Sequence, residues 1–363
     1  MPIIEHLFDL KVPKGLRHDT PIHRIVDFFS VAHTVRSGNL YIPLAERLKD
    51  PNERIDAALD LYAVSVGPCA GMTSFFRNTD EFKEYHERQK RVSYVSCWTQ
   101  IRESVAMWAL YSLNSCSVQI TTTVGQLGDA LSSYCGREHD PRDVLDKADK
   151  NGQFIQSARL VPVKYLSILD LSARINRRRR AYDRLESKGL IRSRATGAGW
   201  SNRDEARANQ YRFAAFELKD ASFSHEMELR AVIEAVPYDL ETLGLARTAR
   251  TELCKRDGDF DIMDPKYDKI ILEFVRGTLR AEGTKKNLNP LEALFLPVPQ
   301  SFVTQVSIDP RCPPHKHEYM TNFFRERGIP VISSTCFGYA ANIIGIQPRS
   351  KLLNDPYYTA RGW

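Results

Sequence analysis

The sequence has few features that mark a membrane, secreted or metal-binding protein. No run of about 20 apolar residues, the length that a helix needs to cross a bilayer, occurs in it. Residues 1–15 include Glu5 and Asp9 and lack the charged and apolar regions of a secretory leader, so we expect none. The seven cysteines form no C-x-x-C pair, which argues against a disulfide framework and a zinc knuckle. We therefore predict a cytoplasmic protein with reduced thiols and no membrane contact.

Common catalytic and metal-binding patterns are also missing from the sequence. The chain has no glycine-rich phosphate-binding loop and no G-x-S-x-G nucleophile elbow. His315 and His317 are one residue apart at an expected helix start, where their rings diverge. An acidic turn lacks the remaining ligand positions of a cation loop; its members are Asp257, Asp259, Asp261 and Asp264. We predict no metal site.

The composition is that of a globular protein with one basic segment. The 363 residues are 42% hydrophobic and 26% charged, with 19 glycines and 19 prolines, which excludes disordered, collagen-like and coiled-coil classes. Residues 174–212 carry twelve Lys or Arg against four Asp or Glu, a local charge of +8 in a chain of net charge +6. The rest of the chain is near −2, so the basic segment favours a polyanionic partner.

Short strands interspersed with irregular helices favour an α+β fold. We predict a single elaborated domain over 1–363, with a core over 20–124 and 155–236, a basic helical insertion over 172–212 and a C-terminal strand–helix–strand extension over 290–340. The local patterns predict strands over 21–29, 39–42, 92–97, 117–123, 223–236 and 302–308, and helices over 31–37, 79–90, 104–112, 172–188 and 315–327.

Several short motifs follow one another in a recognisable order. They are Ile22-His23-Arg24-Ile25, the segments 38–44 and 49–53, Val95-Ser96-Cys97-Trp98, the segment 104–111, and Phe223 to Arg230. From about Ile22 to Val236 this order resembles the bacterial domain-of-unknown-function 2971 family, with departures at Asn52, Trp98 and Leu229. The layout is also similar to ADP-ribosyltransferases. That similarity implies split antiparallel sheets, NAD as substrate, and transfer of ADP-ribose to a nucleophile.

Two glutamates are the candidate catalytic residues. Cleavage of the nicotinamide–ribose bond develops positive charge on the sugar, which a nearby carboxylate stabilises. Glu226 and Glu228 lie two residues apart at an expected strand start, so both point to one face. The resemblance implies that Glu228 is the carboxylate beside the ribose and that Glu226 orients the incoming nucleophile. The alternative is a solvated strand edge on which the acids pair with Arg230.

The first motif offers a cation for the nucleotide. His23 and Arg24 alternate on a strand, so only one of them faces a ligand. Arg24 is preferred because its guanidinium is permanently charged and can donate two parallel hydrogen bonds to phosphate oxygens. The alternative for both residues is that they are surface strand residues. The resemblance adds Tyr41 to the expected NAD-binding residues.

Aromatic residues of the middle motifs form a candidate wall for the nucleotide rings. Ser104, Trp108 and Tyr111 recur three and four residues apart and share a helical face. Trp98 ends the preceding strand, and Ser104 begins a helix whose backbone amides suit a phosphate. The alternative for Trp108 and Tyr111 is core packing.

The basic segment is the candidate nucleic-acid contact. Arg177, Arg178, Arg179 and Arg180 lie on an expected helix, and Trp200 and Tyr211 are available for base stacking, which favours RNA. The alternative is a solvated helix face.

These features favour an ADP-ribosyltransferase-like enzyme that cleaves NAD and modifies a macromolecule, RNA or another nucleic acid among the possible acceptors. The resemblance further implies a bacterial toxin or phage-defence effector with an antitoxin or inhibitor protein as partner. A non-catalytic nucleic-acid-binding protein is the alternative. A metal-dependent nuclease shares the basic segment but lacks an acidic ligand set. NAD consumption distinguishes the first function from the other two.

Overall fold

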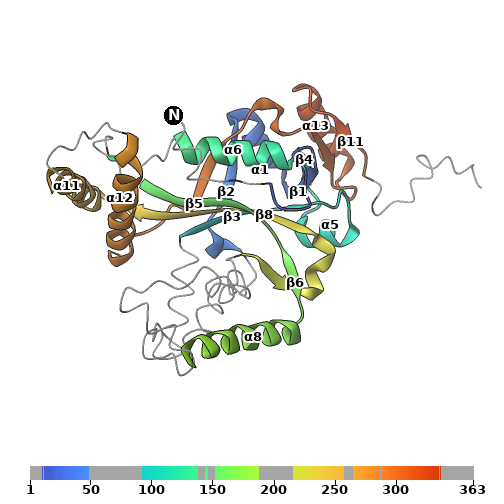
Figure 1. Cartoon of the computed structure of the whole chain (residues 1–363). Helices are drawn as coiled ribbons and strands as arrows, with labels where there is room; N and C mark the ends of the chain where they lie inside the picture. Colours follow the sequence, from blue (N-terminus) through green and yellow to red (C-terminus); the bar gives the residue numbers. More distant parts are fainter. Residues whose placement is uncertain are drawn as a thin grey trace, which may run out of the picture. The chain divides into compact units, whose positions relative to one another are not determined.

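The computed structural model describes residues 10, 12–48, 92–137, 144–145, 152–187, 216–256, 265–286, 288–334 and 336 (Figure 1). Helices and strands are mixed in this part of the chain, and the strands pair both parallel and antiparallel, which is compatible with the predicted α+β class. The chain divides into two compact units. The first comprises Met1–Ile22, His33–Gln100 and Thr122–Phe302, and the second comprises His23–Ala32, Ile101–Thr121 and Val303–Trp363.

Three antiparallel strands form the centre of the first unit, in the order β3 (Ser93–Thr99), β8 (Glu228–Tyr238) and β5 (Gly152–Pro162). Strand β8 lies in the middle, pairing Cys97 with Arg230 on one side and Val161 with Arg230 on the other. Both edges of β8 are hydrogen-bonded and nearly every side chain is buried, which fits its apolar residues from Ala231 to Tyr238, interrupted by Glu234; the charged Glu228 and Arg230 lie at its start.

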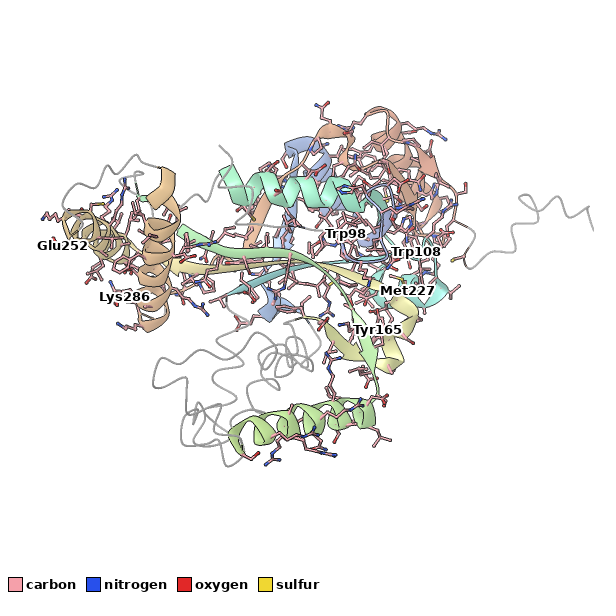
Figure 2. The ribbon with its side chains drawn as sticks, in the orientation of Figure 1. Trp98, Trp108, Tyr165, Met227, Glu252 and Lys286 are labelled. Atoms are coloured by element: carbon pink, nitrogen blue, oxygen red, sulfur yellow. The ribbon has the colours of Figure 1, made fainter. Side chains whose placement is uncertain are left out.

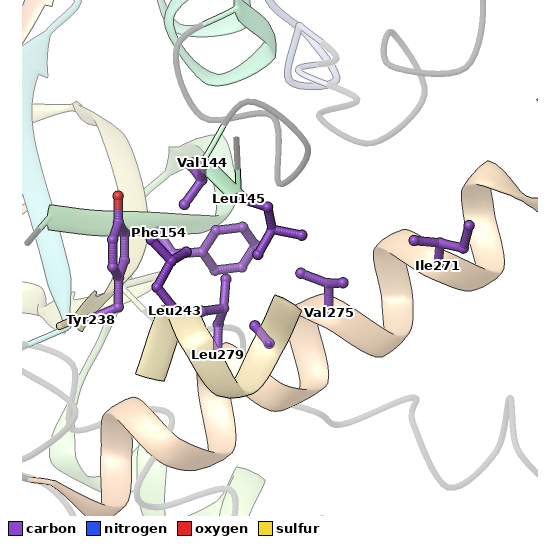
Figure 3. Close-up of a cluster of buried hydrophobic side chains, with 9 residues drawn as sticks. Val144, Leu145, Phe154, Tyr238, Leu243, Ile271, Val275 and Leu279 are labelled. Carbon is purple, nitrogen blue, oxygen red and sulfur yellow. The ribbon is translucent and has the colours of Figure 1, made fainter. Parts of the chain in front are cut away.

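Helices α6 (Val124–Arg137), α11 (Leu240–Arg256) and α12 (Pro265–Lys285) supply apolar side chains to this unit. A buried cluster joins α11 and α12 to the ends of β5 and β8 (Figure 3); its members are Val144, Leu145, Phe154, Tyr238, Leu243, Ala246, Ile271, Val275 and Leu279. Gly283 permits the close approach of α12 to β8, because a Cβ atom there would lie 2.5 Å from the carbonyl oxygen of Pro237.

Two short strand pairs complete the first unit. Strand β2 (Asn39–Pro43) pairs antiparallel with β9 (Ala293–Pro297). Strand β6 (Lys164–Leu166) pairs in parallel with β7 (Leu218–Asp220). Helix α8 (Ile168–Ser187) follows β6, and the 3-10 helix η3 (Ala221–Glu226) follows β7 directly (Figure 1). Strand β7 and η3 thus lead the chain into the start of β8.

The strands of the second unit run in the order β11 (Val331–Ile332), β10 (Gln305–Ile308), β4 (Ser117–Thr123) and β1 (Pro21–Asp27). Strand β10 is antiparallel to β4 and parallel to β11. The helices are α1 (Phe28–Ser37), α5 (Val105–Tyr111) and α13 (Pro314–Arg325). Phe28 packs edge-on against Phe323 and Phe324 of α13, which anchors this helix in the unit.

The expected strands and helices within the described residues are confirmed, with boundary shifts of a few residues, except at one place. The expected strand over 223–236 begins only at Glu228, because Ala221–Glu226 is a 3-10 helix. The Asp220 carboxylate accepts a hydrogen bond from the Ser222 amide at the start of that helix, and Met227 ends it with φ of 41°. The expected helix over 79–90 and the acidic turn over 257–264 lie outside the described residues. None of the helices in the described ranges has the length and apolarity needed to cross a membrane.

Candidate functional site

Four charged side chains meet where β8 begins in the first unit. They are Lys219 of β7, Glu226 of η3, and Glu228 and Arg230 of β8, and we call them the charge cluster. Glu226 and Glu228 are brought together by Lys219, whose ammonium lies 2.6 Å from Glu226 Oε2 and 3.2 Å from Glu228 Oε2. The two candidate catalytic carboxylates therefore share one cation.

The backbone turn at Met227 sets this geometry. Met227 adopts a left-handed conformation, and its side chain is half exposed at the entrance to β8 (Figure 2). The Glu226 carbonyl accepts a hydrogen bond from the Thr99 hydroxyl, and the Gln100 amide donates to the Met227 carbonyl at 3.3 Å. Glu226 therefore reaches Lys219 from a turn tied to the end of β3, and not from the strand that the sequence predicted.

Arg230 fixes the second carboxylate. Its Nε donates to Glu228 Oε1 at 2.9 Å and its Nη2 donates to Glu228 Oε2 at 3.1 Å. Burial by itself raises the pKa of Glu228, but the charges of Arg230 and Lys219 and a hydrogen bond from Cys97 together hold it below its ordinary value. Glu228 is consequently ionised at neutral pH.

The cluster is almost completely shielded from water. The residues Glu226, Glu228 and Arg230 are exposed by 2%, 5% and 0%, and the Lys219 side chain by 8%. Burial lowers the pKa of Lys219, but the two carboxylates outweigh burial and hold this pKa above its ordinary value. Two carboxylates and two cations balance formally, so the acids form a neutralised buried network, and the alternative of a solvated strand edge is wrong. The pairing of Glu228 with Arg230 is confirmed.

Tyr165 and Phe223 complete the surroundings of the cluster. The Tyr165 hydroxyl accepts a hydrogen bond from the Glu228 amide at 2.8 Å. Burial is the main reason that the pKa of Tyr165 is raised to about 12, so the phenol stays protonated. The Phe223 ring lies under the Lys219 ammonium, 4.7 Å from its centroid, where a cation–π interaction further stabilises the positive charge.

Chemically, the cluster places a positive charge between two anionic oxygens. Carboxylates arranged in this way stabilise a cation that forms close to them during a reaction. Arg230 keeps Glu228 ionised and fixed, while the Lys219 ammonium occupies the position between the acids. The arrangement therefore suits electrostatic stabilisation of a developing cation better than general acid catalysis, which requires a protonated carboxyl group.

The first-motif residues lie in different surroundings. In the second unit His23 is buried with Nδ1 2.9 Å from Thr121 Oγ1, while the adjacent Arg24 is partly exposed, as strand alternation predicts. In the first unit the Tyr41 hydroxyl accepts a hydrogen bond from Arg47 at 3.2 Å. The nucleotide-binding roles expected for Arg24 and Tyr41 stay predictions.

The middle aromatics are mainly core residues. Trp98 in the first unit is buried edge-on against Phe302, and its Nε1 donates to Ser96 at 3.0 Å. Trp108 in the second unit is also buried, in a cluster with Ile25 and Met107. The position of Trp108 agrees with the core-packing alternative. Tyr111 is 45% exposed, and Ser104 begins α5 without a side-chain capping bond.

Part of the basic segment is a regular helix. Arg177 to Arg180 all lie on α8, with Arg177 and Arg180 exposed to solvent and Arg179 partly exposed. The side chain of Arg178 and the residues Trp200 and Tyr211 lie outside the described part. The structure thus gives the segment an exposed arginine face on a helix of 20 residues.

Lys219, Tyr165 and Thr99 are the site residues that the sequence analysis missed. Lys219 precedes Glu226 by seven residues and Glu228 by nine. This short separation from the E-x-E pair is the local signal by which Lys219 could have been found. Tyr165 and Thr99 come from strands that are distant in sequence, so no local pattern identifies them.

Comparisons with protein-family models, with curated proteins and with solved structures find no match for this chain.

Proposed function

We propose that this chain is an ADP-ribosyltransferase-like enzyme that cleaves NAD at the nicotinamide–ribose bond and transfers ADP-ribose to a macromolecule. Glu228 is the carboxylate that stabilises the ribosyl cation, and Glu226 orients the attacking nucleophile. The observation that carries the proposal is the Lys219 ammonium held between Glu226 and Glu228, which marks a place where the fold stabilises positive charge.

The charges of the cluster support this assignment. An ionised carboxylate about 4 Å from a unit positive charge contributes roughly 4 kcal/mol at an effective dielectric constant of about 20. Glu228 is kept ionised by Arg230, so it meets the developing cation without a change of protonation. For the ribose to take the position between the acids, Lys219 has to withdraw. The Lys219 ammonium is held by one bond to each acid at the end of a four-carbon side chain, whereas Arg230 holds Glu228 alone with two bonds.

We further propose that the acceptor is nucleic acid, with RNA favoured, and that the protein acts as a bacterial toxin or phage-defence effector controlled by an inhibitor protein. The support for the acceptor is the local charge of +8 over 174–212 and the exposed Arg177 and Arg180 of α8. We expect bacterial growth to stop when the wild-type chain is expressed and to stay normal when the Glu228→Gln variant is expressed.

The test of the enzymatic proposal measures nicotinamide release from NAD by the purified chain, with and without cell lysate. Glu228→Gln preserves the shape of the side chain and removes its charge, so turnover should fall at least about a hundredfold. Labelled NAD then identifies the acceptor, because nuclease or protease digestion removes the label from one class of product and not the other.

Glu234→Gln is the matched control. Glu234 lies on the same strand, but it pairs with Ser157 and Arg159 and is about a fifth exposed. This variant should turn over NAD like the wild type, and melting curves of both variants establish that they are folded. The proposal is overturned if the wild type releases no nicotinamide under either condition, or if a folded Glu228→Gln protein keeps full turnover.

The second candidate is a non-catalytic nucleic-acid-binding protein. The observation that favours it is the neutralisation of both acids by Lys219 and Arg230, which is what a purely structural buried network requires. Binding of single-stranded RNA by a chain that consumes no NAD is the result that selects this candidate.

A further inference from the structure

Two cysteines meet in the second unit although they are far apart in sequence. Cys116 immediately precedes β4, and Cys312 follows β10, which is antiparallel to β4. The pairing places Ile308 opposite Val118, and the Asp309 amide donates to the Ser117 carbonyl at 3.1 Å. The same end of the strand pair therefore carries both cysteines, and they are close enough for Cys116 to contribute to the raised pKa of Cys312.

The two thiols have different surroundings. Cys312 is buried, whereas Cys116 is partly exposed and its sulfur lies 3.5 Å from the Lys316 ammonium of α13. The pKa of Cys312 is raised to about 11, mainly because the thiol is buried. Cys116 and the Asp309 carboxylate raise this pKa further, whereas the charge of Lys316 lowers it. Cys312 is thus a protected thiol, and Cys116 is the accessible sulfur with a cation beside it.

We propose that Cys116 and Cys312 are a redox-active pair that a peroxide converts into an intramolecular disulfide. This inference is independent of the proposed enzymatic function. Cys116 is the attacking residue because its sulfur is reachable and Lys316 offsets the negative charge of the attacking thiolate. Cys312 is the resolving residue because it lies beside Cys116 at the same end of the β4–β10 pair.

The chemistry has two steps with hydrogen peroxide as the oxidant. Cys116 first releases its proton to water, and the thiolate attacks one peroxide oxygen so that the S–O bond forms and the O–O bond breaks. The departing hydroxide takes up the released proton and leaves as water. Cys312 then attacks the sulfur of the resulting sulfenic acid, so that the S–S bond forms and the S–O bond breaks. Hydroxide leaves with the Cys312 proton as a second water, and two electrons have passed from sulfur to the peroxide.

The disulfide would connect the start of β4 to the residues just before α13. Asp309 lies between β10 and Cys312 and forms an ion pair with Arg311. The Arg311 guanidinium also donates to the Trp108 and Ser112 carbonyls, at 2.8 and 3.0 Å. The backbone just before Cys312 is therefore anchored next to the end of β4 that carries Cys116. A thiol reductant reverses it.

The experiment treats the folded full-length chain with a small molar excess of hydrogen peroxide, blocks remaining thiols with N-ethylmaleimide, and maps peptides by mass spectrometry. Trypsin yields peptides 103–137 and 312–316, and chymotrypsin separates Cys116 from Cys135 by cutting at the residues between them. We expect a Cys116–Cys312 linked peptide that disappears after reduction. Cys312→Ser should instead accumulate a sulfenic acid at Cys116 that dimedone traps.

The controls make each outcome decisive. Cys254→Ser removes a partly exposed thiol of α11 and should leave the linkage intact. Lys316→Gln should slow its formation up to about fivefold, as expected for one exposed charge pair, and Lys316→Arg should restore it. The proposal is overturned if the folded wild type gives no such linkage, or if protein unfolded in guanidinium forms it equally well. An unchanged rate in Lys316→Gln contradicts the role of Lys316.

Discussion

Arg230 holds the Glu228 carboxylate with two parallel hydrogen bonds, Nε to Oε1 at 2.9 Å and Nη2 to Oε2 at 3.1 Å. The two residues lie two apart on β8, which places both side chains on the same face of the strand. Such a pair offsets the large desolvation cost of its two charges only while both members are present. Loss of one partner leaves an uncompensated charge in the interior of the first unit.

The first prediction is therefore that Arg230→Met lowers the free energy of unfolding by about 3–5 kcal/mol. Urea unfolding followed by circular dichroism measures the loss. Arg159→Met is the control, because its pair with Glu234 spans 3.3 Å between side chains that are 31% and 22% exposed. Removing that pair should cost about 1 kcal/mol or less. Equal losses in the two variants contradict the importance assigned to the buried pair.

A second prediction concerns acid stability through His23. Burial is the main cause that lowers the pKa of His23 from 6.5 to about 4, the Arg102 charge adds to the effect, and Glu103 opposes it. The unfolded chain therefore takes up a proton near pH 6.5, whereas the folded chain does so only near pH 4. This difference in pKa contributes about 3 kcal/mol to the free energy of unfolding. The contribution is complete above pH 6.5 and is lost as the pH falls from 6.5 to 4.

Unfolding free energies measured at several pH values between 7 and 4 check this expectation. His23→Gln keeps a polar side chain near Thr121 but cannot take up a proton, so its stability should vary less with pH across that window. His225→Gln, at an exposed position on η3, should retain the wild-type pH dependence. If His23→Gln and the wild type lose stability in parallel, His23 does not control this acid sensitivity.

The third prediction separates the two aromatic residues of α5. Trp108 is buried, so Trp108→Ala should leave a large cavity and lower the free energy of unfolding by about 3–5 kcal/mol. Tyr111 on the same helix is 45% exposed, and Tyr111→Ala should change stability by about 0.5 kcal/mol or less. Thermal melting compares them directly. Similar melting temperatures for the two variants contradict the core-packing role of Trp108.

Much of the fold was predictable because its signals are local. The alternating apolar and β-branched residues over 92–97 predicted β3, the many β-branched residues over 117–123 predicted β4, and Ser104 correctly marked the start of α5. Gly38 follows α1 with φ of 67°, a conformation that glycine adopts without steric cost, so the end of that helix was also readable. These elements depend on residues that are neighbours in sequence.

The candidate site was only partly predictable. Glu226 and Glu228 were identified, but the left-handed turn at Met227 replaced the expected strand and changed how Glu226 reaches its partner. The burial of Glu228 depends on β3 and β5 flanking β8, and β3 lies more than a hundred residues earlier in the chain. Periodicity within 223–236 contains no information about those partners, so the acids were expected at a solvated edge or an open site, whereas they are in the interior.

The last prediction concerns the arginine face of α8 and the proposed nucleic-acid acceptor. Phosphate contacts release counterions, so binding of single-stranded RNA should weaken steeply with salt, and each contact should contribute about 0.7 to the log–log slope. Replacing Arg177 to Arg180 by Gln should lower the affinity and reduce the slope by up to about 3. NAD hydrolysis without acceptor should be unchanged, because α8 supplies no member of the charge cluster. Filter binding across a salt series and nicotinamide release are measured on the same variant. An unchanged slope means that α8 is a solvated helix, and a loss of NAD hydrolysis in a folded variant means that α8 takes part in catalysis.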